Sequence, residues 1–149
     1  MFGGASREII KILRTQNVTY NSHRYCITEE SLENSHLNGN WRIVSTNKDV
    51  NGYEFISAFE SLNYPFYGIQ FHPEKNRFEF RYANIPHTTD AVKISQYFAE
   101  FFVNECRKNN HSYPDWLSEQ DALIYNYDPV FTGKMNSSYL QLYMFTETD

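Results

Sequence analysis

Apolar residues recur at helical spacing in two segments of the chain. In residues 6–15, four aliphatic side chains follow Ser6, which is a suitable N-cap, and the segment predicts a short helix. A longer apolar stripe marks residues 90–110, and its members are Ala91, Ile94, Phe98, Phe101 and Phe102. Thr89 or Asp90 is expected to cap the start of this second helix. Both segments therefore predict amphipathic helices with one face in a core.

Shorter runs of aromatic and β-branched residues predict strands. Residues 41–46 and 53–61 flank the turn-forming segment NKDVNG, so together they predict a hairpin. Residues 65–71 are nearly all apolar, which is typical of a strand covered on both faces. The remaining expectations are a strand at 23–28, a loop or single helical turn at 29–40, a loop at 72–89, and two strands within 122–145. This mixture indicates an α/β fold with layered packing.

Composition and charge narrow the possible functions. The chain has 149 residues, enough for one domain with a real core, and its 41% hydrophobic content argues against disorder. A net charge of −5 without any lysine- or arginine-rich run argues against nucleic acid and membrane surfaces as partners. No window approaches the roughly 20 apolar residues that a membrane helix needs. A small or polar ligand is the partner class that these observations leave.

Two signals about the location of the protein disagree. Residues 1–16 contain no apolar core and no small-residue cleavage site, so they predict no signal peptide. Three N-x-S/T sequons are nevertheless typical of a protein of the secretory pathway. These glycosylation candidates are Asn17, Asn110 and Asn136. Cys26 and Cys106 do not decide the question, because two cysteines allow one disulfide or none.

A histidine, a proline and a glutamate follow directly on the apolar run of residues 65–71. Pro73 fixes its own φ and keeps His72 extended, so the side chains of His72 and Glu74 are expected on the same side. A carboxylate beside an imidazole fixes the tautomer of the ring, as a general base for a serine or cysteine nucleophile requires. By spacing alone such a segment is more often a solvated turn, so both interpretations stay open.

Several longer segments resemble one known family. The strings NYPFYGIQFHPEKNRFEF, AEFFVNECRKNN and ALIYNYDPVFTG are similar, in order and spacing, to the γ-glutamyl hydrolases, a family with the class I glutamine amidotransferase-like fold. The string VTYNSHRYCIT resembles the family segment with a second functional histidine. The resemblance implies a three-layer α/β/α fold and cysteine-peptidase chemistry on folate polyglutamates or other γ-glutamyl conjugates, without a cofactor. It leaves open whether the parent enzyme is a monomer or a homodimer.

The resemblance also assigns roles to individual residues. It makes His72 the catalytic base and acid and Glu74 its orienting carboxylate. His23 matches the histidine that lines the substrate site, and Asn21 and Arg24 flank it as substrate-binding candidates. Without the resemblance, His23 would be interpreted as a surface or half-buried loop residue. The other histidines lie in polar loops without ligand spacing, so no metal site is expected; they are His36, His87 and His111.

The nucleophile that this chemistry needs is not recognisable in the chain. In the family it is a cysteine on a sharp, glycine-flanked turn between a strand and a helix, and neither Cys26 nor Cys106 lies in such a sequence. Cys106 falls near the edge of the helical stripe and is expected to be a packing residue.

We therefore expect residues 1–149 to be the C-terminal part of a single γ-glutamyl hydrolase domain that lacks the N-terminal strands and the nucleophile elbow. The parent enzyme is expected to be secreted, lysosomal or vacuolar, and this chain alone inactive or very weak, because triad members act as a unit. The alternative is a non-catalytic remnant or regulatory half-domain that binds γ-glutamyl or folate ligands.

Overall fold

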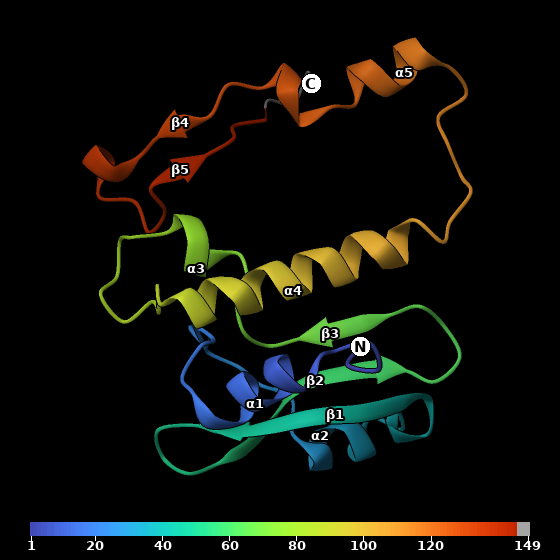
Figure 1. Cartoon of the computed structure of the whole chain (residues 1–149), viewed down its shortest axis with the longest axis vertical. Helices are drawn as coiled ribbons and strands as arrows, with labels where there is room; N and C mark the ends of the chain where they lie inside the picture. The colour runs from blue at the N-terminus through green and yellow to red at the C-terminus, as the bar shows by residue number, and fades with distance from the viewer. Residues whose placement is uncertain (146–149) are drawn as a thin grey trace.

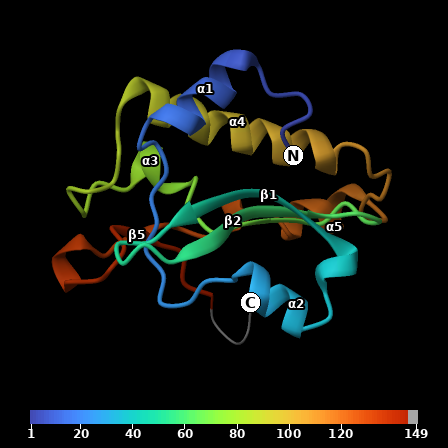
Figure 2. The same cartoon turned by 90° about the horizontal axis from the view of Figure 1, so that it is seen from below.

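The computed structural model describes residues 1–145, and residues 146–149 of the expected domain lie outside them. Helices lie on both faces of a three-stranded antiparallel sheet, with α1 and α4 on one face and α2 on the other (Figures 1 and 2). The helices are α1 (Arg7–Thr15), α2 (Glu29–Asn34), α3 (Lys75–Phe78), α4 (Thr89–Cys106) and α5 (Trp116–Asp121). The strands are β1 (Trp41–Lys48), β2 (Glu54–Ser61), β3 (Tyr67–Ile69), β4 (Val130–Phe131) and β5 (Gln141–Leu142). The layered α/β class predicted from the sequence is confirmed.

The sheet has the order β1-β2-β3, with β2 in the centre and both pairs antiparallel. The hairpin predicted for residues 41–61 is confirmed, and most of β2 is buried because it has a neighbour on each side. β3 was expected to be covered on both faces, but it is a short edge strand whose Tyr67 is exposed. Gly68 faces Phe59, and a Cβ at this position would approach Cζ of that ring to 2.6 Å, so the pairing of β2 with β3 requires glycine here.

The core lies between α1, α4 and the start of the segment that follows β3. Its buried members are Ile9, Ile12, Val18, Phe71, Ala91, Ile94 and Phe98. Ser6 caps α1 as predicted, since its Oγ accepts a hydrogen bond from Ile9 N at 3.2 Å. The cap of α4 is Thr88, not Thr89 or Asp90, because only Thr88 combines an extended backbone with an oxygen within reach of the first turn.

Four further expectations need correction. Residues 23–28 form no strand but an irregular segment, although Ile27 O accepts a hydrogen bond from Ile56 N of β2 at 2.8 Å. The loop predicted at 72–89 contains the short helix α3, whereas in residues 29–40 the six-residue helix α2 agrees with the helical alternative predicted there. Phe102, which was assigned to the apolar stripe of α4, is 65% exposed. Cys106 is exposed as well and does not pack in the core, because the last turns of α4 extend beyond α1 (Figure 1).

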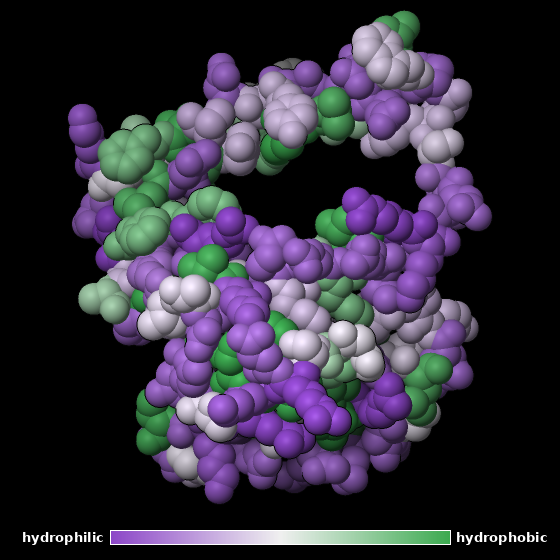
Figure 3. Space-filling view, viewed as in Figure 1, coloured by the Kyte–Doolittle hydropathy of each residue, from purple (hydrophilic) through white to green (hydrophobic). Residues whose placement is uncertain are grey.

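The C-terminal segment stands apart from the sheet and returns to α3. It carries α5 and the hairpin β4–β5, and these two strands are much shorter than the alternation in 122–145 suggested. Figure 3 shows an opening between this segment and α4. The segment touches α3 where the Lys75 ammonium lies 4.8 Å from the centre of the Tyr139 ring. Within residues 1–145, no helix combines the length and the apolar character that crossing a membrane requires.

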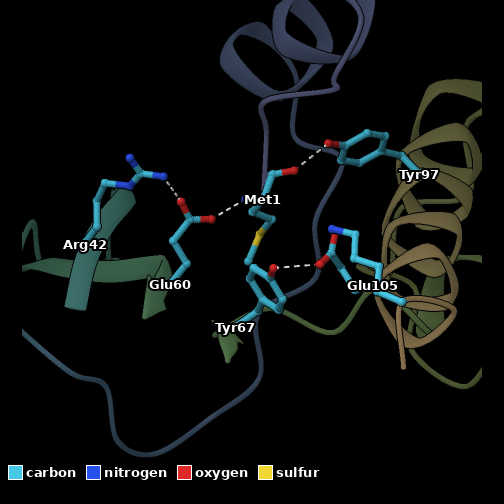
Figure 4. A network of polar contacts seen from close by, with 7 residues as sticks. Met1, Arg42, Glu60, Tyr67, Tyr97 and Glu105 are labelled. Atoms are coloured by element: carbon cyan, nitrogen blue, oxygen red, sulfur yellow. Dashed lines mark hydrogen bonds and ion pairs between the residues drawn. The ribbon is translucent and has the colours of Figure 1, made fainter. Parts of the chain in front are cut away.

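A buried carboxylate connects β2 to the start of the chain (Figure 4). Glu60 is 8% exposed and forms ion pairs with the amino group of Met1 and with Arg42 Nη2. Burial alone would raise the pKa of Glu60, but the hydrogen bonds and charges of the two cationic partners outweigh it and leave the pKa below its ordinary value. Near this network the Tyr67 hydroxyl donates to Glu105 Oε2 at 2.9 Å.

We expect Glu60 to make the stability of the chain depend on pH. Because its pKa is lower in the folded state, the unfolded chain binds more protons, so the stabilisation is complete above the unfolded pKa and is lost as the pH falls through the folded pKa. Urea unfolding followed by circular dichroism between about pH 3 and pH 6 measures this loss. The loss of stability on acidification should be smaller in Glu60→Gln, whose amide does not titrate; parallel curves for the two proteins would contradict the prediction.

Candidate functional site

His72 and Glu74 form a hydrogen-bonded pair just beyond β3. Nδ1 of His72 lies 2.9 Å from Oε1 of Glu74, so the two side chains project to the same side, as the His-Pro-Glu geometry predicts. An ionised carboxylate only accepts hydrogen bonds, so the neutral ring carries its proton on Nδ1 and leaves the lone pair of Nε2 free. No residue of 1–145 bonds to that nitrogen. The arrangement can accept a proton at Nε2, and its catalytic role stays a prediction.

The His72–Glu74 pair is exposed, but the backbone around it is anchored. His72 N donates to Tyr20 O at 2.9 Å, which ties the end of the sheet region to the segment between α1 and α2. The Ser95 hydroxyl of α4 donates to Pro73 O. Asn76 lies two residues after Glu74 and is 2% exposed, and its side-chain amide donates hydrogen bonds to two other segments of the chain. The imidazole of His72 is 37% exposed. The ring therefore lies at the surface, while the backbone that carries it is fixed by the contacts of His72 N, Pro73 O and Asn76.

His23 lies in the segment before α2, and both of its ring nitrogens have partners. Nδ1 is 3.0 Å from Tyr25 O, and Nε2 is 3.2 Å from Oδ1 of Asn21. The carbonyl of Tyr25 requires a proton on Nδ1 of His23, so Nε2 of the neutral ring can only accept a hydrogen bond. The side chain of Asn21 pairs with Nε2 when the NH₂ group of Asn21, and not its oxygen, faces the ring. The ring also makes an edge contact with Phe55 of β2 at 5.7 Å between centroids. His23 and Asn21 therefore form one unit that suits holding a ligand better than moving a proton.

A cavity of about 1050 Å³ lies beside His23. Its walls are formed by α1, the segment between α1 and α2, the strand β1 with the turn after it, and Phe55 of β2; they include Asn17, Asn21, His23 and Lys48. His72 and Glu74 are not among its lining residues; the cavity reaches only their neighbour Phe71. The structure thus brings His23 and Asn21 together at one cavity, and places the His72–Glu74 pair just outside it.

The other candidate residues lie apart from these two groups. Arg24 is exposed and forms no hydrogen bond or ion pair with residues 1–145. Cys26 and Cys106 are free and exposed, so they form no disulfide with each other. Cys26 precedes α2 without a strand before it, and Cys106 ends α4, so neither has the geometry of a nucleophile elbow. In the described part of the chain, no group of three His, Cys, Asp or Glu side chains is placed to hold a metal ion.

Sequence reasoning missed the residues that anchor the candidate pair. They are Tyr20, Asn76 and Ser95, whose partners lie far away along the chain. Asn76 follows the His-Pro-Glu-Lys string directly, but nothing in its neighbours indicates that it is buried. The partners of Asn76 and Tyr20 become adjacent only when the chain is folded, so no local pattern could have found them.

Comparison with known proteins gives two findings. The glutamine amidotransferase class-I family matches residues 3–87, which include the sheet, His23, His72 and Glu74. The γ-glutamyl hydrolases of Mus musculus and Homo sapiens are each 40% identical to the chain over 147 residues, 97% of this chain and 46% of the relative. γ-Glutamyl hydrolase 2 of Arabidopsis thaliana is 38% identical over 141 residues, 94% of this chain and 40% of the relative. The resemblance read from the sequence is confirmed, and the chain spans about half the length of the curated relatives it matches.

Proposed function

Because the chain belongs to the glutamine amidotransferase class-I family, we propose that it carries the histidine–carboxylate part of a γ-glutamyl hydrolase active site. The single observation that carries the proposal is the 2.9 Å contact between His72 Nδ1 and Glu74 Oε1 at the end of the sheet. The identity to mouse and human γ-glutamyl hydrolases supports the choice of reaction. In this proposal residues 1–149 are the C-terminal part of one domain.

In the proposed chemistry, His72 moves one proton in each half of the reaction. Nε2 first takes the proton of a cysteine thiol, and the resulting thiolate attacks the carbonyl carbon of a γ-glutamyl amide; the C–N bond breaks as Nε2 gives this proton to the leaving nitrogen, and a thioester remains. Nε2 then takes a proton from the water that attacks the thioester, and gives it to the thiolate that leaves. Glu74 accepts from Nδ1 in both steps, so it keeps Nε2 directed at the reacting atoms and stabilises the imidazolium.

Folate polyglutamates and related γ-glutamyl conjugates are the proposed substrates. Each γ-linked glutamate retains a free α-carboxylate, so a chain of them is strongly anionic. The guanidinium of Arg24 is exposed and unpaired within residues 1–145, and such a group binds carboxylates through paired hydrogen bonds. His23 and Asn21 line the cavity, of which Arg24 is not a lining residue, and they offer further polar contacts.

The nucleophilic cysteine is proposed to come from outside this chain, because neither Cys26 nor Cys106 lies on an elbow. The test is a chimera in which this chain replaces the part of the mouse γ-glutamyl hydrolase that it matches. Release of glutamate from a γ-glutamyl peptide is expected for the chimera and for the mouse enzyme, and not for the isolated chain. A folded but inactive chimera would contradict the function, and activity of the isolated chain would show that the nucleophile lies within it.

A second candidate function is ligand binding without turnover, favoured by the cavity at His23, which exists without any nucleophile. Poly-γ-glutamate would then raise the melting temperature of the isolated chain, because a ligand at a hundredfold excess over Kd stabilises the folded state by about 2.7 kcal/mol. The variant His23→Ala, which changes a wall of this cavity, should weaken the effect.

We also propose that the protein passes through the secretory pathway. The three sequon asparagines, Asn17, Asn110 and Asn136, are all exposed, as modification requires. A shift in mass on treatment of the natural protein with an N-glycosidase would support this location.

A further inference from the structure

We infer that Asn76 is a positioning residue that holds the His72–Glu74 pair in register with the segment that carries His23. The importance of Asn76 for catalysis rests on the proposed function, whereas its hydrogen bonds are independent of that proposal. Asn76 is the second residue of α3 and follows Glu74 by two positions, so any movement of its side chain acts on the start of that helix.

The side chain of Asn76 is one of the most deeply buried polar groups of the protein, at 2% exposure. Its Nδ2 donates two hydrogen bonds, to Val18 O at 2.8 Å and to Pro86 O at 3.0 Å. The acceptors belong to segments 58 and 10 residues away along the chain. A single amide group thus joins α3 to the segment after α1 and to the loop before α4, and both of its N–H groups are used.

The contact with Val18 has a second member on the same segment. Tyr20, two residues further along, accepts a hydrogen bond from His72 N at 2.9 Å. In an extended chain, carbonyls two residues apart point to the same side, so Val18 O and Tyr20 O together form one edge that faces residues 72–76. This edge continues through Asn21 to His23, so the two bonds set the spacing of the two histidine-bearing segments.

Asn76 is also held through its own backbone. Its carbonyl accepts from Nδ1 of His87 at 2.9 Å, and the His87 ring stacks on Phe80 with 4.3 Å between centroids. The loop that returns to α4 therefore contacts Asn76 twice, through Pro86 O at its side chain and through the His87 ring at its carbonyl. These bonds to the side chain and the backbone of Asn76 restrain α3, so we infer that Glu74 at its N-cap position keeps its carboxylate opposite the His72 ring.

The test compares Asn76→Ala with two controls in the isolated chain. Asn126→Ala is matched in chemistry, because the Asn126 amide also donates to two backbone carbonyls, but it does so near α5 and at the surface. Leu32→Ala is the control for a general loss of stability. Leu32 is 5% exposed, so its truncation destabilises the fold, but it lies on α2, across the sheet from α4 (Figure 2). Each variant is examined by NMR for the tautomer of the neutral His72 ring and for hydrogen exchange of the His72 amide.

In Asn76→Ala we expect the His72 ring to lose its preference for the Nδ1–H tautomer, and its amide to exchange at least tenfold faster than the fall in global stability explains. Both controls should keep the tautomer. If Asn76→Ala does not fold, Asn76→Ser, which retains one donor, is measured instead and should show the same changes in part. An unchanged tautomer and amide in a folded Asn76 variant, with only the loss of stability seen in Leu32→Ala, would overturn the inference.

These outcomes are independent of turnover. A His72 response to Asn76→Ala together with an inactive chimera would refute the proposed function and leave the positioning contact standing. No response together with an active chimera would refute the positioning role alone.

Discussion

Replacing His72 by alanine in the chimeric hydrolase is expected to lower kcat/KM about 10³- to 10⁴-fold, which corresponds to roughly 4–5.5 kcal/mol of lost transition-state stabilisation. The ring is the group that would move the proton to the leaving nitrogen, and its only bonded side-chain partner within residues 1–145 is Glu74. Steady-state hydrolysis of a γ-glutamyl peptide measures the loss. Stability should change little, because the ring is 37% exposed.

Two matched variants sharpen the test of His72. In Glu74→Gln the new amide can donate to Nδ1 and so favours the wrong tautomer, and kcat should fall by more than tenfold while KM changes little. His111→Ala removes an exposed histidine of the segment after α4 and should leave the rate unchanged. Activity of His72→Ala within tenfold of the parent chimera would exclude His72 as the catalytic base.

Replacing Phe98 by alanine is expected to destabilise the chain by about 3–5 kcal/mol. Phe98 is 5% exposed and its ring meets Phe71 edge-on at 5.1 Å, Tyr97 at 5.4 Å and Phe2 at 5.9 Å between centroids. The variant loses these contacts and leaves a cavity between α1 and α4. Since small domains are stable by only about 5–15 kcal/mol, this loss is a large part of the total.

Urea unfolding followed by circular dichroism measures the cost, and Phe102→Ala is the matched control. Phe102 is the same residue type one turn further along α4, but it is 65% exposed, so its removal should cost no more than about 0.5 kcal/mol. Equal losses in the two variants would mean that the core does not lie on the Phe98 face. Because Phe71 precedes His72 directly, the Phe98 variant should also broaden the NMR signals of the His72 ring.

Much of the fold follows from local patterns. The helical spacing of Ile9 and Ile12 in α1, and of Ala91, Ile94 and Phe98 in α4, predicts which faces are buried, because a helix places residues three and four apart on one side. The hairpin of β1 and β2 follows from its turn residues in the same way. Prediction failed where neighbours in space decide the outcome: β3 is apolar but lies at an edge, and Phe102 continues the stripe beyond the end of α1.

In the candidate site, too, the contacts between residues close in sequence could be predicted and those set by neighbours in space could not. That His72 and Glu74 face each other could be predicted, because Pro73 stiffens the backbone between two residues that are close in sequence. The pairing of His23 with Asn21 was not predicted as a contact, although the two residues are separated by one position. The cavity beside them needs β1 as its other wall, so no local pattern describes it.

By itself, the sequence determined the two amphipathic helices and the His72–Glu74 pair, because each depends on residues within a few positions of one another. It also determined the α/β class and the family resemblance, because both follow from the order of local patterns along the chain. Only the tertiary structure decided that Asn76 is buried, that its amide bonds to Val18 O, and that Tyr20 O receives the His72 amide. These contacts join residues more than fifty positions apart, and a buried polar group reveals its partners only after the chain has closed around it.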